Sequence, residues 1–82
     1  MRLENVKLNH QKTDEVRFIA NLVQVACDFK SSIYLKTEGK SINAKSIMGM
    51  MALSLENIDE ISIQVEGSDE DKALDILVEL FN

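Results

Sequence analysis

The sequence of 82 residues contains no proline, one histidine and one cysteine. The single cysteine, Cys27, excludes an intramolecular disulfide, and one histidine and one cysteine in separate elements offer no ligand cluster for a metal ion. Without proline, no helix begins with the fixed backbone angle that this residue supplies. Cys27 lies late in a helical pattern, so we expect a small buried or half-buried thiol rather than a nucleophile.

Long apolar runs and a basic charge balance are also missing. No segment approaches the length of a membrane span, and the first residues lack the apolar core of a signal peptide. The net charge of -5 argues against binding to nucleic acid or to anionic membranes. We therefore expect a cytoplasmic protein without a metal or cofactor. At 82 residues and 45% hydrophobic content, residues 1–82 should form one domain with a single modest core.

The first half of the chain alternates strand and helix patterns. An imperfectly alternating segment, with Leu3, Val6 and Leu8 as apolar positions, predicts a first strand. Thr13 or Asp14 is then placed to cap a helix. The apolar residues of that helix recur at helical spacing and should face a sheet, namely Ile19, Leu22, Val23 and Ala26. Residues 32–37 and 40–43 predict a hairpin that turns at Gly39.

The second half begins with a short apolar helix over residues 46–53. A half-buried strand follows, in which Ile61, Ile63 and Val65 alternate with polar residues. Gly67 and Ser68 break this strand, and the sequence Ser68-x-x-Asp71 places a hydroxyl and acidic residues at the start of a last helix. The apolar side of that helix consists of Ala73, Leu74, Ile76, Leu77, Leu80 and Phe81.

The predicted order is therefore β-α-β-β-α-β-α. The fold class is α+β, because an antiparallel sheet with helices on one face would bury both long apolar stripes and leave the polar strand residues on the other face. We expect an open-faced sandwich, with a four-stranded antiparallel sheet and three helices on one side.

Ser46 directly precedes the short apolar helix. At this position a hydroxyl can accept from the free backbone N–H groups of the first helical turn. A phosphoryl group on Ser46 would be stabilised there, and it would change the charge of the surrounding surface. Ile47, Met48 and Met51 lie within about one turn of the serine. On so short a helix they cannot all face inward.

Two segments of this region carry a family resemblance, Gly-Lys-Ser at 39–41 and Asn-Ala-Lys-Ser-Ile-Met-Gly at 43–49. They resemble the regulatory-serine region of HPr, the histidine-containing phosphocarrier of the bacterial sugar phosphotransferase system. Further matches are Leu22-Val23-Gln24 with Ala26 and Phe29, and residues 65–70. Essentially all 82 residues align without a gap. A motif this long is much less prone to chance matches than a pattern of two or three residues.

The resemblance implies a regulatory role for Ser46 and a docking role for its neighbours. In the family, the residues that match Ile47, Met48 and Met51 form an exposed patch for enzyme I, sugar-specific transporter domains, HPr kinase/phosphorylase and a catabolite-control transcription regulator. Methionine suits several partners because its thioether side chain is flexible. Arg17 and Lys45 would supply charge at the rim of this patch, whereas Met50 is expected in the core.

The family's active centre, Gly-x-His-Ala-Arg-Pro-Ala, aligns with residues 13–19, and only Arg17 is retained. Glu15 occupies the place of the phosphate-accepting histidine. A carboxylate is charged at neutral pH and repels an incoming phosphoryl group, which excludes phosphohistidine transfer at this position. Two alternatives for an acceptor are an acyl phosphate on Glu15 and a relocated site at His10. We favour the simpler interpretations, an acid stabilised at a helix start and a solvated loop histidine.

Phe18 stands where the family has its proline. We expect its ring either to pack over Ile47 and Met48, which would extend the docking surface, or to be buried under the neighbouring loop. We favour the first arrangement.

Three functions remain open at this point. The leading hypothesis is an HPr-like regulatory protein, similar to catabolite-repression HPr, that is phosphorylated at Ser46 and docks through Ile47, Met48 and Met51. The second is a phosphotransferase-system carrier with an unrecognised acceptor. The third is a scaffold that is never phosphorylated, with Glu15 as a permanent charge. None of these is a self-contained enzyme, because no second catalytic group accompanies Glu15 and so small a domain has little room for a substrate pocket.

Overall fold

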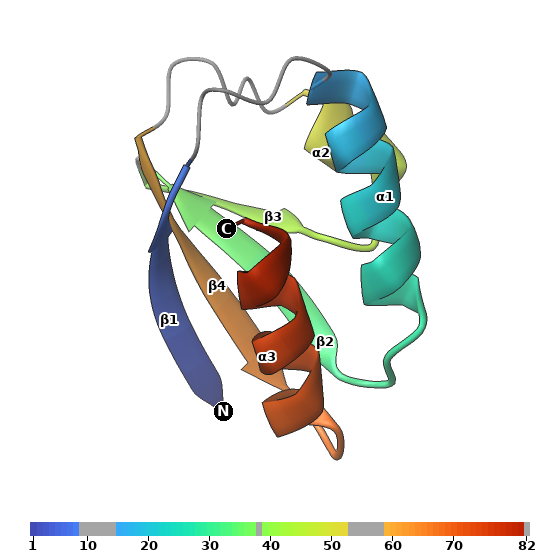
Figure 1. Ribbon diagram of the computed structural model, residues 1–82, viewed down its shortest axis with the longest axis vertical. Helices are drawn as coiled ribbons and strands as arrows, with labels where there is room; N and C mark the ends of the chain where they lie inside the picture. The colour runs from blue at the N-terminus through green and yellow to red at the C-terminus, as the bar shows by residue number, and fades with distance from the viewer. Residues whose placement is uncertain (9–14, 38, 53–58, 82) are drawn as a thin grey trace.

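The computed structural model describes residues 1–8, 15–37, 39–52 and 59–81, in which four strands and three helices follow one another along the chain (Figure 1). The elements are β1 (Arg2–Lys7), α1 (Glu15–Cys27), β2 (Ser32–Thr37), β3 (Lys40–Asn43), α2 (Ile47–Met51), β4 (Glu60–Glu66) and α3 (Glu70–Leu80). This order confirms the predicted β-α-β-β-α-β-α arrangement. Among the described helices, none has the length and apolar character needed to cross a membrane.

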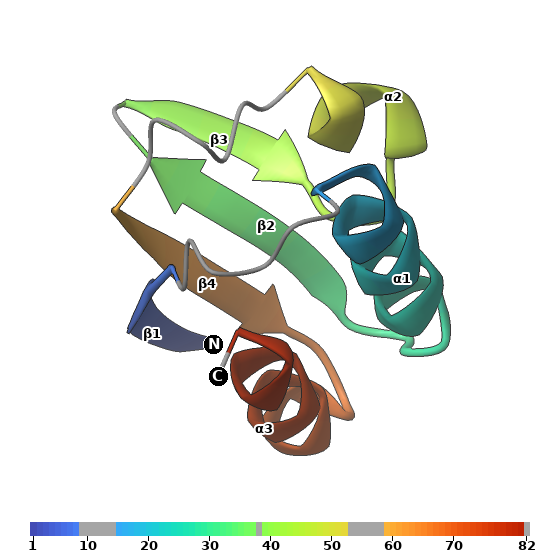
Figure 2. The same ribbon diagram turned by 45° about the horizontal axis from the view of Figure 1, so that its top comes forward.

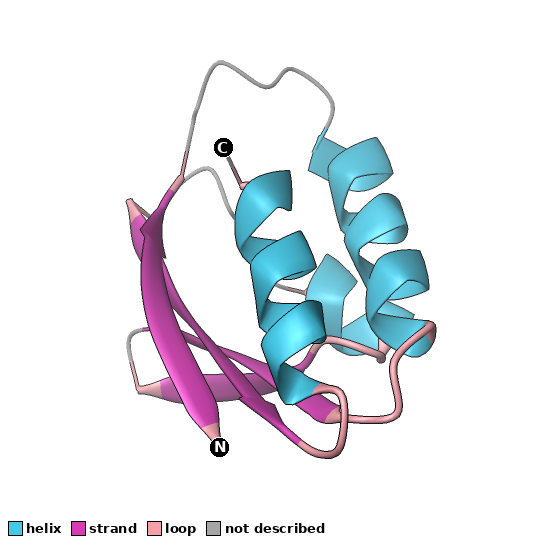
Figure 3. Cartoon of the chain, turned by 60° about the horizontal axis from the view of Figure 1, so that its bottom comes forward, coloured by secondary structure: helices cyan, strands magenta, loops and turns pink. Residues whose placement is uncertain are grey.

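The strands form one antiparallel sheet in the order β1-β4-β2-β3 (Figure 2). The hairpin of β2 and β3 has the predicted bounds, and Gly39 adopts a φ of 80° between the two strands, a conformation that glycine tolerates best. The helices lie together on one face of the sheet (Figure 3). The predicted α+β open-faced sandwich is therefore confirmed.

The core lies between this helical layer and the sheet. Ile61, Ile63 and Val65 alternate along β4 and are buried, as their spacing predicts. All four apolar positions expected to face the sheet from α1 are also buried. Among the residues that the structure describes, the buried apolar side chains are Val6, Ile19, Leu22, Val23, Ala26, Ile33, Leu35, Ala44, Met50, Ile61, Ile63, Val65, Ala73, Leu74, Leu77 and Phe81.

Two apolar residues have other surroundings than the sequence suggests. Leu3 lies opposite Gln64 of β4, and its side chain is exposed on the face of the sheet away from the helices. Side chains alternate between the two faces along a strand, and Leu3 lies an odd number of residues from the buried Val6. The half-buried ring of Phe18 packs edge to face against Phe81, with the ring centroids 5.3 Å apart. Both expectations for Phe18 named other neighbours, and neither included the end of α3.

The start of α3 also differs from the prediction. The residue that precedes the helix is Asp69, and Ser68 is exposed one residue further out. The carboxylate of Glu70 accepts the backbone N–H of Gly67 at 3.2 Å, so an acidic side chain bonds back to the turn as it does in a capping box. The predicted acidic residues do lie in the first turn, as Glu70 and Asp71, whereas Ser68 lies outside the helix because Asp69 takes the N-cap position.

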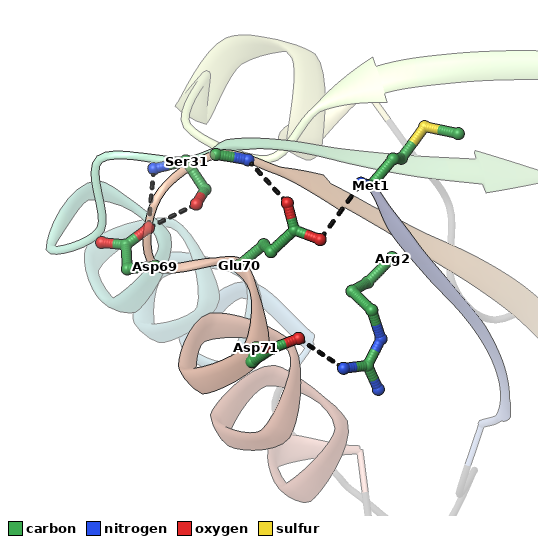
Figure 4. Close-up of polar contacts among 7 residues, drawn as sticks. Met1, Arg2, Ser31, Asp69, Glu70 and Asp71 are labelled. Atoms are coloured by element: carbon green, nitrogen blue, oxygen red, sulfur yellow. Dashed lines mark hydrogen bonds and ion pairs between the residues drawn. The ribbon is translucent and has the colours of Figure 1, made fainter.

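Asp69 instead joins two loops that are distant in the sequence (Figure 4). Its carboxylate accepts the backbone N–H groups of Lys30 and Ser31, each at 2.9 Å, and the Ser31 hydroxyl. Hydrogen bonds to the ionised form, that from the Ser31 hydroxyl first, lower the pKa of Asp69 below its usual 3.8. Gly67 makes this approach sterically feasible, because an added Cβ would lie 2.6 Å from the Ser31 Cα.

Met1 and the first residue of β1 bind the same end of α3. The amino group of Met1 lies 3.1 Å from the Glu70 carboxylate, and Arg2 pairs with Asp71 (Figure 4). The Gly67 N–H and then the Met1 ammonium lower the pKa of Glu70. These charged groups are partly exposed, so we regard them as fixing the position of β1 more than as a large source of stability.

Lowering the pH should destabilise the folded protein by protonating the Asp69 carboxylate. Because the folded pKa is depressed, the carboxylate contributes stability above the unfolded pKa of about 4, and this contribution is lost as the pH falls through the folded pKa. We expect Asp69→Asn to lower the urea midpoint at neutral pH and to reduce its fall between about pH 6 and about pH 3. Urea unfolding followed by circular dichroism at several pH values measures both effects.

Asp75→Asn, which changes an exposed acid on α3, is the matched control and should keep the wild-type pH dependence. If Asp69→Asn loses stability in acid as steeply as the wild type, another group is responsible.

Candidate functional site

Ser46 is the N-cap of α2. Its φ and ψ of -99° and 109° are extended, and its Oγ accepts the backbone N–H of Gly49 at 3.2 Å. The serine carbonyl accepts the N–H of Met50 at 3.0 Å, which begins the helical bonding. The side chain is half-buried rather than enclosed. The helix is shorter than predicted, since α2 ends at Met51 with Ala52 as its C-cap, and residue 53 lies outside the described residues.

The turn before Ser46 is fixed by its own hydrogen bonds. Asn43 accepts the N–H of Lys45 on its side-chain oxygen at 2.9 Å and the N–H of Ser46 on its carbonyl at 3.0 Å. The N–H of Ala44 donates to the Ile33 carbonyl of β2 at 2.9 Å. The backbone on both sides of the serine is therefore held in place by hydrogen bonds.

Lys45 has a structural contact that the sequence did not suggest. Its half-buried ammonium donates to the Phe29 carbonyl at 2.7 Å, just beyond the end of α1. A cation is favourable at this end of a helix because the last carbonyl groups carry partial negative charge. The expected role of Lys45 at the rim of a docking surface stays a prediction, and the ammonium has further N–H donors that this contact leaves uncommitted.

Three apolar residues of α2 face solvent. Ile47, Met48 and Met51 are 46%, 83% and 47% exposed, whereas Met50 is fully buried. Successive residues of a helix turn by about 100°, so Ile47 and Met51 lie about 60° and 100° from Met50, and Met48 lies about 160° away. The exposures follow these angles. We call Ile47, Met48 and Met51 the α2 patch.

The start of α1 lies in the same helical layer (Figure 1). Glu15 is its first residue, and Arg17 is exposed in its first turn. His10 and the expected caps Thr13 and Asp14 lie outside the described residues. Val16, also in the first turn, is 60% exposed, and sequence reasoning did not single it out. It lies three residues before the buried Ile19, which is the spacing of a core position, so the pattern gives no signal of its exposure.

Cys27 is exposed, which corrects the expectation of a buried or half-buried thiol. It is the last residue of α1, at the edge of the stripe that packs on the sheet, and its Sγ lies 3.8 Å from the Lys45 carbonyl. A helix that ends here leaves no following turn to cover the side chain.

The cap on α2 should be measurable in stability. Ser46→Ala leaves the Gly49 N–H without its acceptor, so we expect a loss of about 1 kcal/mol in the free energy of unfolding. Ser46→Asp, which retains a good N-cap acceptor, should keep most of that stability. Urea titrations of the three proteins measure the difference. Equal stability of Ser46→Ala and the wild type would contradict the capping role.

Comparison with known proteins identifies the family. The family described as "PTS HPr component phosphorylation site" matches residues 4–82. Phosphocarrier protein HPr of Xylella fastidiosa is 43% identical over 65 residues, which cover 79% of this chain and 73% of that protein. HPr-like protein Crh of Bacillus subtilis is 41% identical over 63 residues, which cover 77% of this chain and 74% of that protein.

A solved structure supports the same assignment. The crystal structure of a phosphocarrier protein HPr from Bacillus anthracis matches with a TM-score of 0.89 and 34% sequence identity, covering 99% of this chain and 96% of that chain. The fold, the matched length and the identity to both HPr and Crh agree, and on these grounds the chain belongs to the HPr family.

Proposed function

We propose that this protein is an HPr-like regulator of the phosphotransferase system and of carbon catabolite control, and that HPr kinase/phosphorylase phosphorylates it at Ser46. One observation carries the proposal. The half-buried hydroxyl of Ser46 caps α2 directly beside the solvent-exposed α2 patch. A charge added to the hydroxyl therefore changes an apolar surface that is already available to partners.

The chemistry asked of Ser46 is simple. The hydroxyl oxygen attacks the γ-phosphorus of a nucleoside triphosphate, the Oγ–P bond forms, and the bond from phosphorus to the bridging oxygen breaks. The nucleoside diphosphate leaves, and the hydroxyl proton passes to a base of the kinase. The product carries a charge of about -1.5 to -2 at neutral pH. This charge is on the three terminal phosphoryl oxygens, while Oγ, which accepts the Gly49 N–H, becomes the bridging ester oxygen.

The α2 patch would bind the partner proteins. Met48, the most exposed residue of the patch, would be its centre, because burial of a large apolar side chain contributes most where it begins fully exposed. Arg17, Phe18 and Lys45 are proposed to line the same surface. Phe18 would contribute a half-buried ring, and Lys45 its remaining N–H donors.

Glu15 determines which activity is not part of the proposed function. The first residue of α1 is an acid where the family's active centre has histidine, so phosphohistidine transfer at this position is not part of the proposed function. The protein would then act as a phosphorylated signal read by a catabolite-control transcription regulator, with enzyme I and transporter domains as further candidate partners. In this role it is a substrate and a ligand, not an enzyme.

Incubation with HPr kinase/phosphorylase and ATP, followed by mass spectrometry, tests the modification. We expect one phosphate on a peptide that contains Ser46, because this residue is half-buried rather than enclosed and hydrogen bonds hold its backbone in place. Ser46→Ala is the control and should remain unmodified, while Ser41→Ala, a change on the exposed strand β3, should be modified normally. A wild-type protein that takes no phosphate would sink the proposal.

Relatives named phosphocarrier protein HPr support a second candidate, a carrier with an unrecognised acceptor. Incubation with enzyme I and phosphoenolpyruvate separates the two functions. The regulatory proposal predicts no acid-labile phosphoryl adduct, because Glu15 lacks the imidazole nitrogen that accepts phosphate near neutral pH. If an adduct forms and is lost in Glu15→Gln or His10→Ala, the carrier function and its acceptor are identified together.

Docking is tested separately with the catabolite-control regulator. Met48→Asp should weaken binding about a hundredfold, because it places a charge at the centre of the apolar α2 patch. Lys72→Asp, on the exposed side of α3, is the control for added negative charge and should bind normally. Isothermal titration with phosphorylated and unphosphorylated protein measures both. Binding that is indifferent to Ser46→Ala but lost in Met48→Asp would indicate a scaffold without a phosphorylation switch.

A further inference from the structure

The backbone conformation at Gly49 does not require glycine. Of the three glycines in the chain, Gly39 and Gly67 have φ values of 80° and 154°, which other residues rarely adopt. Gly49 lies inside α2 without a positive φ. At such a position alanine is the better helix former. The explanation for Gly49 must therefore lie in the space around it.

That space adjoins the candidate phosphorylation site. A Cβ on Gly49 would lie 3.4 Å from the Ser46 Oγ and 3.6 Å from the Ser46 Cβ. It would also lie 3.3 Å from the Ile42 Cγ2, on the other side. The missing side chain therefore leaves unfilled a narrow space between Ile42 of β3 and the Ser46 hydroxyl, in which a Cβ would contact both.

We propose that Gly49 is a specificity-determining residue for phosphorylation of Ser46, because its lack of a side chain keeps one side of the hydroxyl open to the phosphoryl group. This inference rests on the proposed function. When the Oγ–P bond forms, three phosphoryl oxygens must be placed around Oγ, and the nucleotide leaves from the opposite side of the phosphorus. A carbon atom in contact with Oγ takes up part of the volume that these oxygens need.

The effect should appear in the chemical step rather than in docking. The α2 patch, on which the kinase would dock, is unchanged by a substitution at Gly49, so KM should stay near the wild-type value. The turnover number should fall, since a displacement of about 1 Å at the reacting atoms is enough to slow a transfer by about a hundredfold. A general loss of structure would instead lower the melting temperature, which provides a second and independent measurement.

The experiment compares the wild type, Gly49→Ala, Gly49→Gln and Ala52→Gln with HPr kinase/phosphorylase and ATP. We expect kcat to fall about tenfold in Gly49→Ala and further in Gly49→Gln, with KM unchanged. Ala52→Gln adds the same side chain at an exposed position one turn away and should stay within about twofold of the wild type. The melting temperature of Gly49→Ala should stay close to that of the wild type, because the higher helix propensity of alanine opposes the cost of placing its Cβ 3.3 Å from the Ile42 Cγ2.

The contact with Ile42 is tested by a further variant. If Gly49→Ala acts by pushing α2 away from Ile42, then Ile42→Ala in the same protein should restore kcat. If it acts at the hydroxyl, as proposed, the double variant stays slow while Ile42→Ala alone remains a good substrate.

Different results would overturn the proposed function and the inference about Gly49. A wild-type protein that takes no phosphate overturns the proposed function together with this inference. A wild-type protein that is phosphorylated, with Gly49→Ala and Gly49→Gln equally fast, overturns the inference alone. Restoration of kcat by Ile42→Ala also overturns it, because the side chain at position 49 would then act on the helix and not on the serine.

Discussion

The burial of Met50 is the contact on which the arrangement of the candidate site depends. The helix α2 has only five residues, and Met50 is the one it contributes to the hydrophobic core. Once this side chain points inward, the helical rotation places Met48 almost opposite and Ile47 and Met51 at the flanks. The exposed apolar surface therefore follows from helix geometry and short length, and the backbone of the preceding turn then sets where Ser46 lies.

Much of the fold can be read from local pattern. The hairpin was predicted with its observed bounds because β-branched and aromatic residues alternate on either side of a glycine turn, and the buried stripe of α1 follows from its 3.6-residue period. Contacts between distant residues were not predicted. Phe18 meets Phe81, and the Asp69 carboxylate binds the loop around Ser31, 38 positions away. Periodicity describes one element at a time, so it cannot name these partners.

The candidate site could likewise be predicted only in part from the sequence. A serine before an apolar run is enough to predict the N-cap at Ser46, and the short helix is enough to predict that its neighbours are exposed. The contact of Lys45 with the end of α1 could not be predicted, since a lysine beside a serine gives no indication of which carbonyl its ammonium reaches. Gly49 is similar. In the sequence it is only a residue of low helix propensity. The distances from its Cβ position to Ser46 and Ile42 show that a side chain there would contact both residues.

The exposed thiol at the end of α1 also has a practical consequence for studying this region. Cys27 is the only cysteine in the sequence, and its sulfur lies 3.8 Å from the carbonyl of the residue before Ser46. A maleimide dye or a nitroxide spin label would therefore attach at one defined place without any engineered thiol. Its emission or line shape would report on changes in the turn that leads into α2 while a kinase or a binding partner is present.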